Sequence, residues 1–264
     1  MRIALLADLL SRARHWRNLA TSAADDMGLE KFATFNEALE YSKKNMDAQM
    51  LSHEPGYTDI EQFEGVRAWG ALLAFDLRKS TERALRIGAR DTYITMHTYI
   101  PTMLKLIGAV DGRIVGLRGD GAIACFGLVD LGVKAKTVTS EEAASAVGRA
   151  CDCGDAMVKA VQKAVNPVLR EGGVEGNLRI GVGIDVGEIV ATNIGLGKAN
   201  ELTAYGNCVN KACKRSFGND MVVLTREAKR MFPTAVGGRT RFPAYPDKED
   251  AYILRYPEDY STVA

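Results

Sequence analysis

An apolar run ending in a carboxylate opens the most regular part of this sequence. The run WGALLAFDL predicts a buried strand that ends at Asp76. The pattern that follows predicts one or two helices over residues 78–110. Ser80 or Thr81 would be the N-cap of the first, and Pro101 would start a second helical segment. This part of the chain therefore predicts a strand followed directly by a helix.

Two further apolar segments flank a glycine-rich turn. RIVGLR and AIACFG lie on either side of residues 119–121, which predicts a β-hairpin with Asp120 at its tip. Downstream, LRIGVGIDVGEIVATNIG predicts two strands joined near residues 185–187. Helices are predicted over residues 140–166 and 207–217, and strands at MVVLT and AYILRY. TREAKRMF predicts a further helix, with Thr225 as its N-cap. Hairpins are frequent, so we expect an α+β fold with a mixed or antiparallel sheet flanked by helices.

The first part of the chain differs from the rest. Residues 1–65 are charged and helix-rich and end in a loop containing Pro55-Gly56, a strong turn signal. We therefore expect an N-terminal helical arm over residues 1–65, a main domain over residues 66–256 and a tail over residues 257–264. Charged residues interrupt the apolar run near the N-terminus too early for a signal sequence or a membrane span. We expect a cytoplasmic protein with no membrane span.

Composition narrows the class of protein. The 264 residues are 47% hydrophobic and 25% charged, which is ordinary for a soluble globular protein. A formal net charge of +1 argues against a bulk nucleic-acid binder, so no nucleic-acid partner is expected. The five cysteines are scattered and odd in number, which does not indicate a disulfide framework.

Two aspartates are candidates for binding a divalent cation. Asp76 ends the predicted buried strand, and Asp120 lies at the hairpin tip. Mg²⁺ prefers carboxylate oxygens and commonly completes its shell with water and substrate phosphates. Each residue is also ordinary at a strand end or in a turn, so neither alone identifies a metal site.

Two other segments add chemistry that suits a nucleotide. After Asp76 the chain enters a helix at residues 77–81, and free backbone N–H groups at a helix N-terminus bind anions. Further on, Asn210 and Lys214 are four positions apart and share a helix face. An amide that holds a ribose oxygen beside a cation that meets phosphate charge would stabilise a transition state.

Taken together and in order, these segments resemble the class III nucleotidyl cyclases. The family pattern is matched by four segments of this sequence, namely FDLRKST, GDGAIACFG, RIGVGIDVGEIV and GNCVNKACK. The resemblance covers roughly residues 67–255. It implies the class III cyclase fold, which has a ferredoxin-like core.

The resemblance also implies roles for individual residues. Asp76, Asp120 and the Leu77 backbone match the positions that bind two Mg²⁺ or Mn²⁺ ions per site. Asn210 matches the residue that orients the ribose, and Lys214 stands where the family has a transition-state arginine. The neighbouring Arg215 is the alternative for that cation. Phosphate-binding positions are matched by four residues, Arg78, Lys79, Ser80 and Thr81.

Family members act as dimers whose two active sites each combine metal-binding aspartates from one chain with the Asn and Arg from the other. This chain carries both sets, so the resemblance implies a homodimer with composite sites at the interface.

The positions that read the base differ from those of purine cyclases. Gly116 stands where adenylate cyclases usually have a lysine, and Thr203 is the second base-reading position. Arg118 lies on the same strand face as Gly116, and Tyr205 could narrow the pocket. These residues make the chain most similar to the bacterial pyrimidine cyclases of the Pycsar antiphage systems, whose product is sensed by a separate effector.

We expect UTP as substrate, because its two carbonyl acceptors suit an arginine donor, followed by CTP and then ATP. A domain that binds a nucleotide with weak or no turnover is the alternative.

Overall fold

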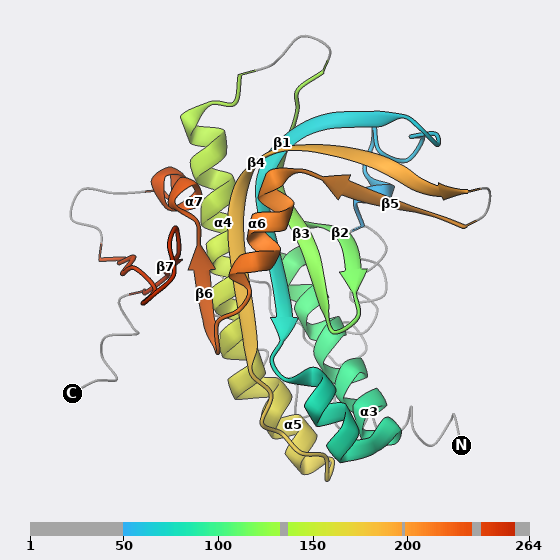
Figure 1. Ribbon diagram of the computed structural model, residues 1–264, viewed down its shortest axis with the longest axis vertical. Helices are drawn as coiled ribbons and strands as arrows, with labels where there is room; N and C mark the ends of the chain where they lie inside the picture. The colour runs from blue at the N-terminus through green and yellow to red at the C-terminus, as the bar shows by residue number, and fades with distance from the viewer. Residues whose placement is uncertain (1–49, 133–136, 197–198, 234–238, 257–264) are drawn as a thin grey trace, which may run out of the picture.

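The computed structural model describes residues 50–132, 137–196, 199–233 and 239–256. Within these ranges the chain forms a seven-stranded mixed sheet with helices against both faces (Figure 1). The predicted α+β class is therefore confirmed. Residues 1–49 of the predicted arm and the whole predicted tail, residues 257–264, lie outside the described residues.

The central strand of the sheet is β1. The strands are β1 (Gly65–Leu77), β2 (Arg113–Arg118), β3 (Gly121–Asp130), β4 (Ile180–Leu196), β5 (Ala199–Tyr205), β6 (Met221–Leu224) and β7 (Tyr252–Ile253). Their order is β2-β3-β1-β4-β6-β7, and β5 pairs with β4 outside this path. β1 is antiparallel to β3 and β4, whereas β6 is parallel to β4. Neighbours on both edges hold β1 in place.

Helices cover the two faces unequally. They are α3 (Ser80–Ala109), α4 (Ser140–Ala160), a π-helical turn η3 (Val161–Val165), α5 (Asn166–Glu171), α6 (Asn207–Arg215) and α7 (Arg226–Met231), with a 3-10 turn η2 (Leu51–His53) before β1. α3 and α4 lie behind the sheet in Figure 1, and α6 lies in front of β1 and β4. No helix among the described residues has the length and apolar content needed to cross a bilayer.

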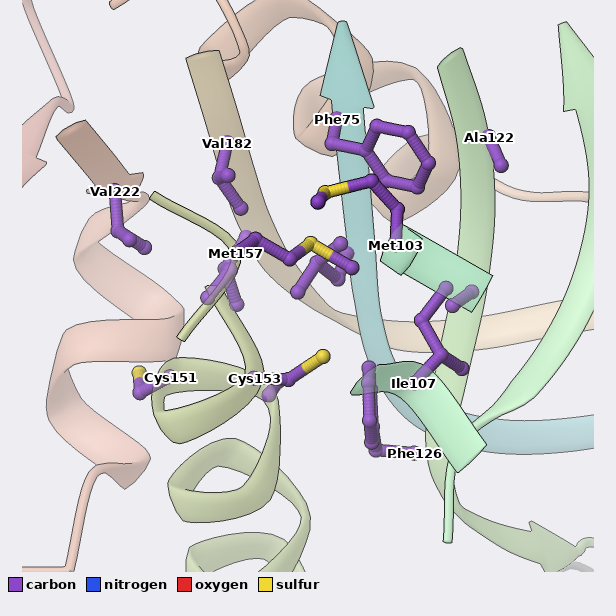
Figure 2. Close-up of a cluster of buried hydrophobic side chains, with 14 of the residues drawn as sticks. Phe75, Met103, Ile107, Ala122, Phe126, Cys151, Cys153, Met157, Val182 and Val222 are labelled. Atoms are coloured by element: carbon purple, nitrogen blue, oxygen red, sulfur yellow. The ribbon is translucent and has the colours of Figure 1, made fainter. Parts of the chain in front are cut away.

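The main core lies between the sheet and helices α3 and α4. Met103 and Ile107 of α3 and Met157 of α4 are fully buried there. Figure 2 shows these side chains beside Phe75 of β1 and Phe126 of β3. Flexible methionine side chains fill irregular gaps between the more rigid aromatic rings. This core fixes the C-terminal part of α3, from Ile94 to Ile107.

A second core lies on the other face of the sheet. Along β1 the side chains alternate, so Leu73 and Phe75 join the main core while Leu72 and Ala74 join the second. The second core is completed from α6, β5 and the segment before β1 by Cys208, Val209, Ala212, Leu202, Ala204, Leu51, Tyr57 and Ile60. By the same alternation Asp76 lies on the face that α6 covers.

Two details of α3 differ from prediction. The N-cap is Lys79 in the left-handed conformation, not Ser80 or Thr81. Pro101 lies inside the helix, and the break is at Gly88, whose φ of 77° no ordinary helix residue adopts.

Arg83 spans this break in α3. From the first segment of the helix its guanidinium reaches Thr95 Oγ1 in the second, at 3.4 Å. It also donates to Asn177 Oδ1 at 2.8 Å, in the loop before β4. The two segments of α3 are therefore joined by a buried side chain as well as by the backbone.

The predicted pair of strands near residues 185–187 is one continuous strand, β4. β4 pairs with β1 from Ile180 to Thr192 without interruption, and Gly187 lies opposite Gly70. Two facing glycines let the paired strands bend there without a clash. The turn signal in the sequence therefore marks a bend within a strand rather than its end.

The tip of the β2–β3 hairpin lies very close to the end of β1. Phe75 pairs with Ala122, and a Cβ added to Gly121 would lie 2.1 Å from the Phe75 carbonyl oxygen. Real Cβ atoms do not approach so closely, so only glycine fits at this position. The absence of a side chain at Gly121 therefore brings Asp120 next to Asp76.

A buried carboxylate joins β4 to α7. Asp185 is 2% exposed and accepts a hydrogen bond from the Thr225 hydroxyl. Thr225 also caps α7, as predicted, by accepting from the Ala228 N–H. Burial, more than any other factor, raises the pKa of Asp185, although the Thr225 hydrogen bond acts in the opposite direction.

The raised pKa of Asp185 predicts a pH-dependent stability. Above the ordinary Asp pKa the folded chain retains a proton that the unfolded chain has lost, so this contribution to stability is lost as pH rises through the folded-state pKa. Asp185→Asn removes the titration. Its free energy of unfolding should therefore fall less than that of the wild type as pH rises above about 4, the ordinary Asp pKa, as measured by urea unfolding. The exposed Asp59→Asn is the control, and equal slopes for Asp185→Asn and the wild type would contradict the assignment.

Gly121→Ala should destabilise the fold by about 1–3 kcal/mol, because the added methyl group collides with the backbone of β1. Gly119→Ala in the same turn has open space, so it should cost only the roughly 1–2 kcal/mol of a left-handed conformation. Thermal unfolding distinguishes the two substitutions. A smaller loss for Gly121→Ala than for Gly119→Ala would contradict the close approach.

Candidate active site

The structure brings the two predicted metal-binding aspartates to the same end of the sheet, where β1 ends and β3 begins. Asp76 lies at the end of β1, directly after the Phe75–Ala122 pair, and Asp120 lies in the tight turn that precedes β3. The Asp76 side chain is 40% exposed. Asp120 Oδ2 is buried and has no hydrogen-bond partner among the described residues. A buried carboxylate oxygen without a donor is well suited to bind a cation.

The surroundings of Asp120 are mostly apolar on the core side. The Tyr99 hydroxyl is buried there, also with no partner among the residues that the structure describes. The Tyr99 ring packs edge-on against Phe75, with ring centroids 6.0 Å apart. Burial and then the charge of Asp120 raise the pKa of Tyr99, and Arg78 opposes them. Asp120, Tyr99 and Arg78 therefore share one electrostatic neighbourhood.

Arg78 is turned toward Asp76 rather than toward solvent. Its guanidinium forms an ion pair with the Asp76 carboxylate, and Nη1 donates to the Phe217 carbonyl at 3.5 Å. Its backbone N–H donates to the Arg179 carbonyl at 2.8 Å. The Arg78 guanidinium, which the resemblance assigns to phosphate binding, thus partly neutralises the Asp76 carboxylate, which the resemblance assigns to metal binding.

The helix end beside Asp76 is open. Lys79 provides no side-chain cap, and its ammonium lies 3.5 Å from Glu82 on the surface. Ser80 is half-buried and Thr81 is exposed at the first turn of α3. Backbone N–H groups at such an end, with two hydroxyl groups beside them, can hold phosphate oxygens.

These residues fit a divalent cation that is shared with a substrate. The donors are two carboxylates and the Leu77 backbone, all of them hard oxygen ligands. Across the described ranges no group of three or more His, Cys, Asp and Glu side chains is placed to hold a metal. Mg²⁺ sites of substrate-assisted type commonly use one or two carboxylates together with phosphate oxygens.

The predicted ribose and transition-state residues lie on one face of α6. Asn210 and Lys214 are exposed, while Cys208, Val209 and Ala212 face the second core. Arg215 is engaged elsewhere, because its Nε donates to the Asp250 carbonyl at 2.9 Å and Nη2 to the Glu249 carbonyl at 3.1 Å. This arrangement favours Lys214 over Arg215 as the available cation.

α6 is seated on β4 through glycines. A Cβ on Gly183 would lie 2.1 Å from the Ala212 carbonyl oxygen, and one on Gly181 would lie 1.9 Å from the Ser216 carbonyl oxygen. Gly181 pairs with Asp76 across the sheet. The C-terminal end of α6 is therefore held against β4, the strand that pairs with β1 at Asp76.

The structure brings three of the four predicted base-reading residues together. Arg118 donates to Thr203 Oγ1 at 3.2 Å, and its guanidinium lies over Gly116. Glu201 also pairs with Arg118, at 3.3 Å between Nη1 and Oε1. Tyr205, the fourth of these residues, is 52% exposed. Glu201 lies beside Arg118 and Tyr99 lies beside Asp120, but the sequence pattern predicts a role for neither, since neither falls within a matched motif.

Known proteins resemble this chain in sequence and in fold. No protein-family model matches the chain. Over 178 residues it is 24% identical to the cytidylate cyclase of Escherichia coli, and the match covers 66% of this chain and 37% of that protein. The chain thus spans well under two thirds of that relative.

Solved cyclase structures share the fold. The guanylyl cyclase Cya2 matches with a TM-score of 0.55 and 23% identity, over 72% of this chain and 91% of that one. The adenylyl cyclase CyaB from P. aeruginosa matches with a TM-score of 0.57 and 20% identity, over 73% and 96%. These likenesses confirm the resemblance drawn from the four motifs, and the fold of this chain is that of the class III nucleotidyl cyclase catalytic domain.

Proposed function

We propose that this chain is a metal-dependent nucleotide cyclase that converts UTP to the 3′,5′-cyclic nucleotide and pyrophosphate. The observation that carries this proposal is the placement of Asp76 and Asp120 at one sheet edge, beside the open N-terminus of α3. The buried Oδ2 of Asp120 has no hydrogen-bond partner among the described residues, so a bound cation would satisfy it. Fold likeness alone would not distinguish a cyclase from an inactive relative.

In the proposed reaction the ribose 3′-oxygen bonds to the α-phosphorus, the bond from that phosphorus to the bridging oxygen breaks, and the 3′-hydroxyl proton is released. Divalent cations held by Asp76 and Asp120 would supply charge neutralisation and a lowered pKa for the 3′-hydroxyl. Asn210 orients the ribose, and Lys214 meets the charge that develops on the phosphates. Lysine acts there as a point charge without the fork of an arginine.

The proposed active form is a homodimer with two composite sites. One protomer would supply Asp76 and Asp120 and its partner Asn210 and Lys214. The β4–β5 hairpin exposes apolar side chains that a second chain could bury, among them Ile194 (51% exposed) and Leu196 (80% exposed). Exposed apolar side chains grouped on one element are typical of an interaction surface.

CTP is the second candidate substrate. The sequence likeness to a cytidylate cyclase favours it, although that likeness covers a minority of the relative. ATP ranks third, because Gly116 leaves out the lysine that adenylate cyclases usually place there. By the same resemblance we propose a role in Pycsar-type antiphage defence, in the cytoplasm, with a product-sensing effector encoded elsewhere.

The purified chain with Mn²⁺ should convert UTP to cyclic UMP faster than it converts CTP, ATP or GTP to their cyclic products. Chromatography of the products against cyclic nucleotide standards measures this. Rapid cyclic AMP formation without a pyrimidine product would overturn the base assignment. Tight nucleotide binding with no cyclic product would indicate an inactive nucleotide-binding domain instead.

Asp120→Asn should abolish turnover without lowering the melting temperature, because it removes a cation ligand one of whose oxygens is buried without a partner among the described residues. Asp76→Asn should also abolish turnover. Because it breaks the ion pair with Arg78, it should lower the melting temperature as well. Asp59→Asn, far along the chain from both, is the matched control. Near-normal rates for either site variant would remove the metal assignment.

Mixing two inactive variants tests the composite dimer. Asp120→Asn and Asn210→Ala should each be inactive alone. After exchange of subunits, half of the dimers are mixed and each of these has one intact site, so about one quarter of wild-type activity should return. A mixture that stays inactive would show that both residues act within one chain.

A further inference from the structure

An ion pair fills the space that Gly116 leaves open. A Cβ built on Gly116 would lie 3.3 Å from Arg118 Nη1, 3.4 Å from Nη2 and 3.4 Å from Glu201 Oε1. Both members of the Arg118–Glu201 pair therefore lie directly over this glycine. Any longer side chain at position 116 would displace them. The absence of a side chain at Gly116 thus allows the Arg118 donor and the Glu201 acceptor to lie side by side over this residue.

Both members of the pair keep groups free for a ligand. The side chains of Arg118 and Glu201 are 49% and 58% exposed. Arg118 uses Nη1 for Glu201 and the Leu117 carbonyl, and Nη2 for Thr203 Oγ1. A guanidinium has five N–H donors and a carboxylate has about four acceptor positions, so each has capacity beyond these contacts. The pair therefore presents a charged donor next to a charged acceptor.

In one position of the base this arrangement complements uracil. Uracil places a carbonyl acceptor next to its N3–H donor, so Arg118 can donate to the carbonyl while Glu201 accepts the N3–H. In that same position cytosine has an unprotonated N3, whose lone pair would face the Glu201 carboxylate. Cytosine meets the pair only after a shift along its edge that places N3 against Arg118 and the amino group against Glu201, and a ribose held by Asn210, as proposed above, opposes that shift. An acceptor placed against an acceptor is costly, which is how hydrogen-bonded sites reject the wrong base.

We infer that Glu201 is a specificity-determining residue that selects uracil over cytosine by accepting the N3–H of the base beside Arg118. This inference rests on the proposed function, since it deepens the assignment of UTP as substrate. Glu201 lies outside the four motifs, and β5 positions it two residues before Thr203 on the same strand.

The test is Glu201→Gln, which preserves the shape of the side chain. Glutamine offers a neutral acceptor for uracil, which is weaker than a carboxylate, and an amide donor for the N3 of cytosine. The ratio of kcat/KM for UTP to kcat/KM for CTP should fall at least about tenfold, equivalent to about 1.4 kcal/mol. Dissociation constants of non-cyclisable UTP and CTP analogues should change in the same direction.

A matched control uses the exposed ion pair between β1 and β4. Glu188 pairs with Arg67 at 2.7 Å, and both side chains are 47% exposed. Glu188→Gln should leave the ratio unchanged. If Glu201 only held Arg118 in position, Glu201→Gln would weaken both nucleotides equally, and an unchanged ratio overturns the inference.

The outcomes also separate this inference from the proposed function. If the wild type makes cyclic UMP and Glu201→Gln leaves the ratio of kcat/KM for UTP to kcat/KM for CTP unchanged, the proposed cyclase function stands and the role of Glu201 in base selection is wrong. If the wild type binds the analogues but does not cyclise UTP or CTP, the proposed cyclase function is wrong. The effect of Glu201→Gln on the ratio of the two analogues' dissociation constants then tests the role of Glu201. A wild type that binds neither pyrimidine analogue overturns both.

Discussion

The candidate site depends on the pairing of β1 with a different strand along each edge. On one edge β3 brings the hairpin tip to Asp76, and on the other β4 brings the glycines on which α6 is seated. Both contacts are backbone-to-backbone approaches that a single methyl group would prevent. A one-residue shift of β1 would exchange the two buried faces, so the two cores together fix the register. The chemistry of the site is therefore determined by the packing of one strand.

The site retains polar groups that the fold leaves unsatisfied. Asp120 Oδ2 and the Tyr99 hydroxyl are both buried without partners among the described residues, and each such group usually costs about 1–3 kcal/mol. Arg78 pairs with Asp76 rather than with either group, and its Nε is also buried without a partner among the described residues. The proposed cation would compensate the buried Asp120 oxygen. The same neighbourhood that destabilises the empty chain would favour the bound one.

The sequence predicts the motif residues better than their surroundings. The hairpin around Asp120, the Thr225 cap and the shared face of Asn210 and Lys214 all follow from local pattern, because turns, caps and helix periodicity are short-range properties. The continuity of β4 does not follow from local pattern, since a bend at glycine within a strand and a turn between two strands have the same local sequence. Glu201 was missed for a related reason. Its meaning comes from Arg118 on another strand, and no local pattern encodes that contact.

The break at Gly88 separates the N-terminal end of α3, which we propose to bind phosphate, from the segment that the main core holds. Arg83 reconnects them through Thr95, and it ties both to the loop before β4 through Asn177 and the Glu175 carbonyl. The orientation of the helix end that we propose for phosphate binding is thus set by a charged side chain anchored in a loop far along the chain. Substitutions in that loop would change this orientation without altering any residue proposed to contact the nucleotide.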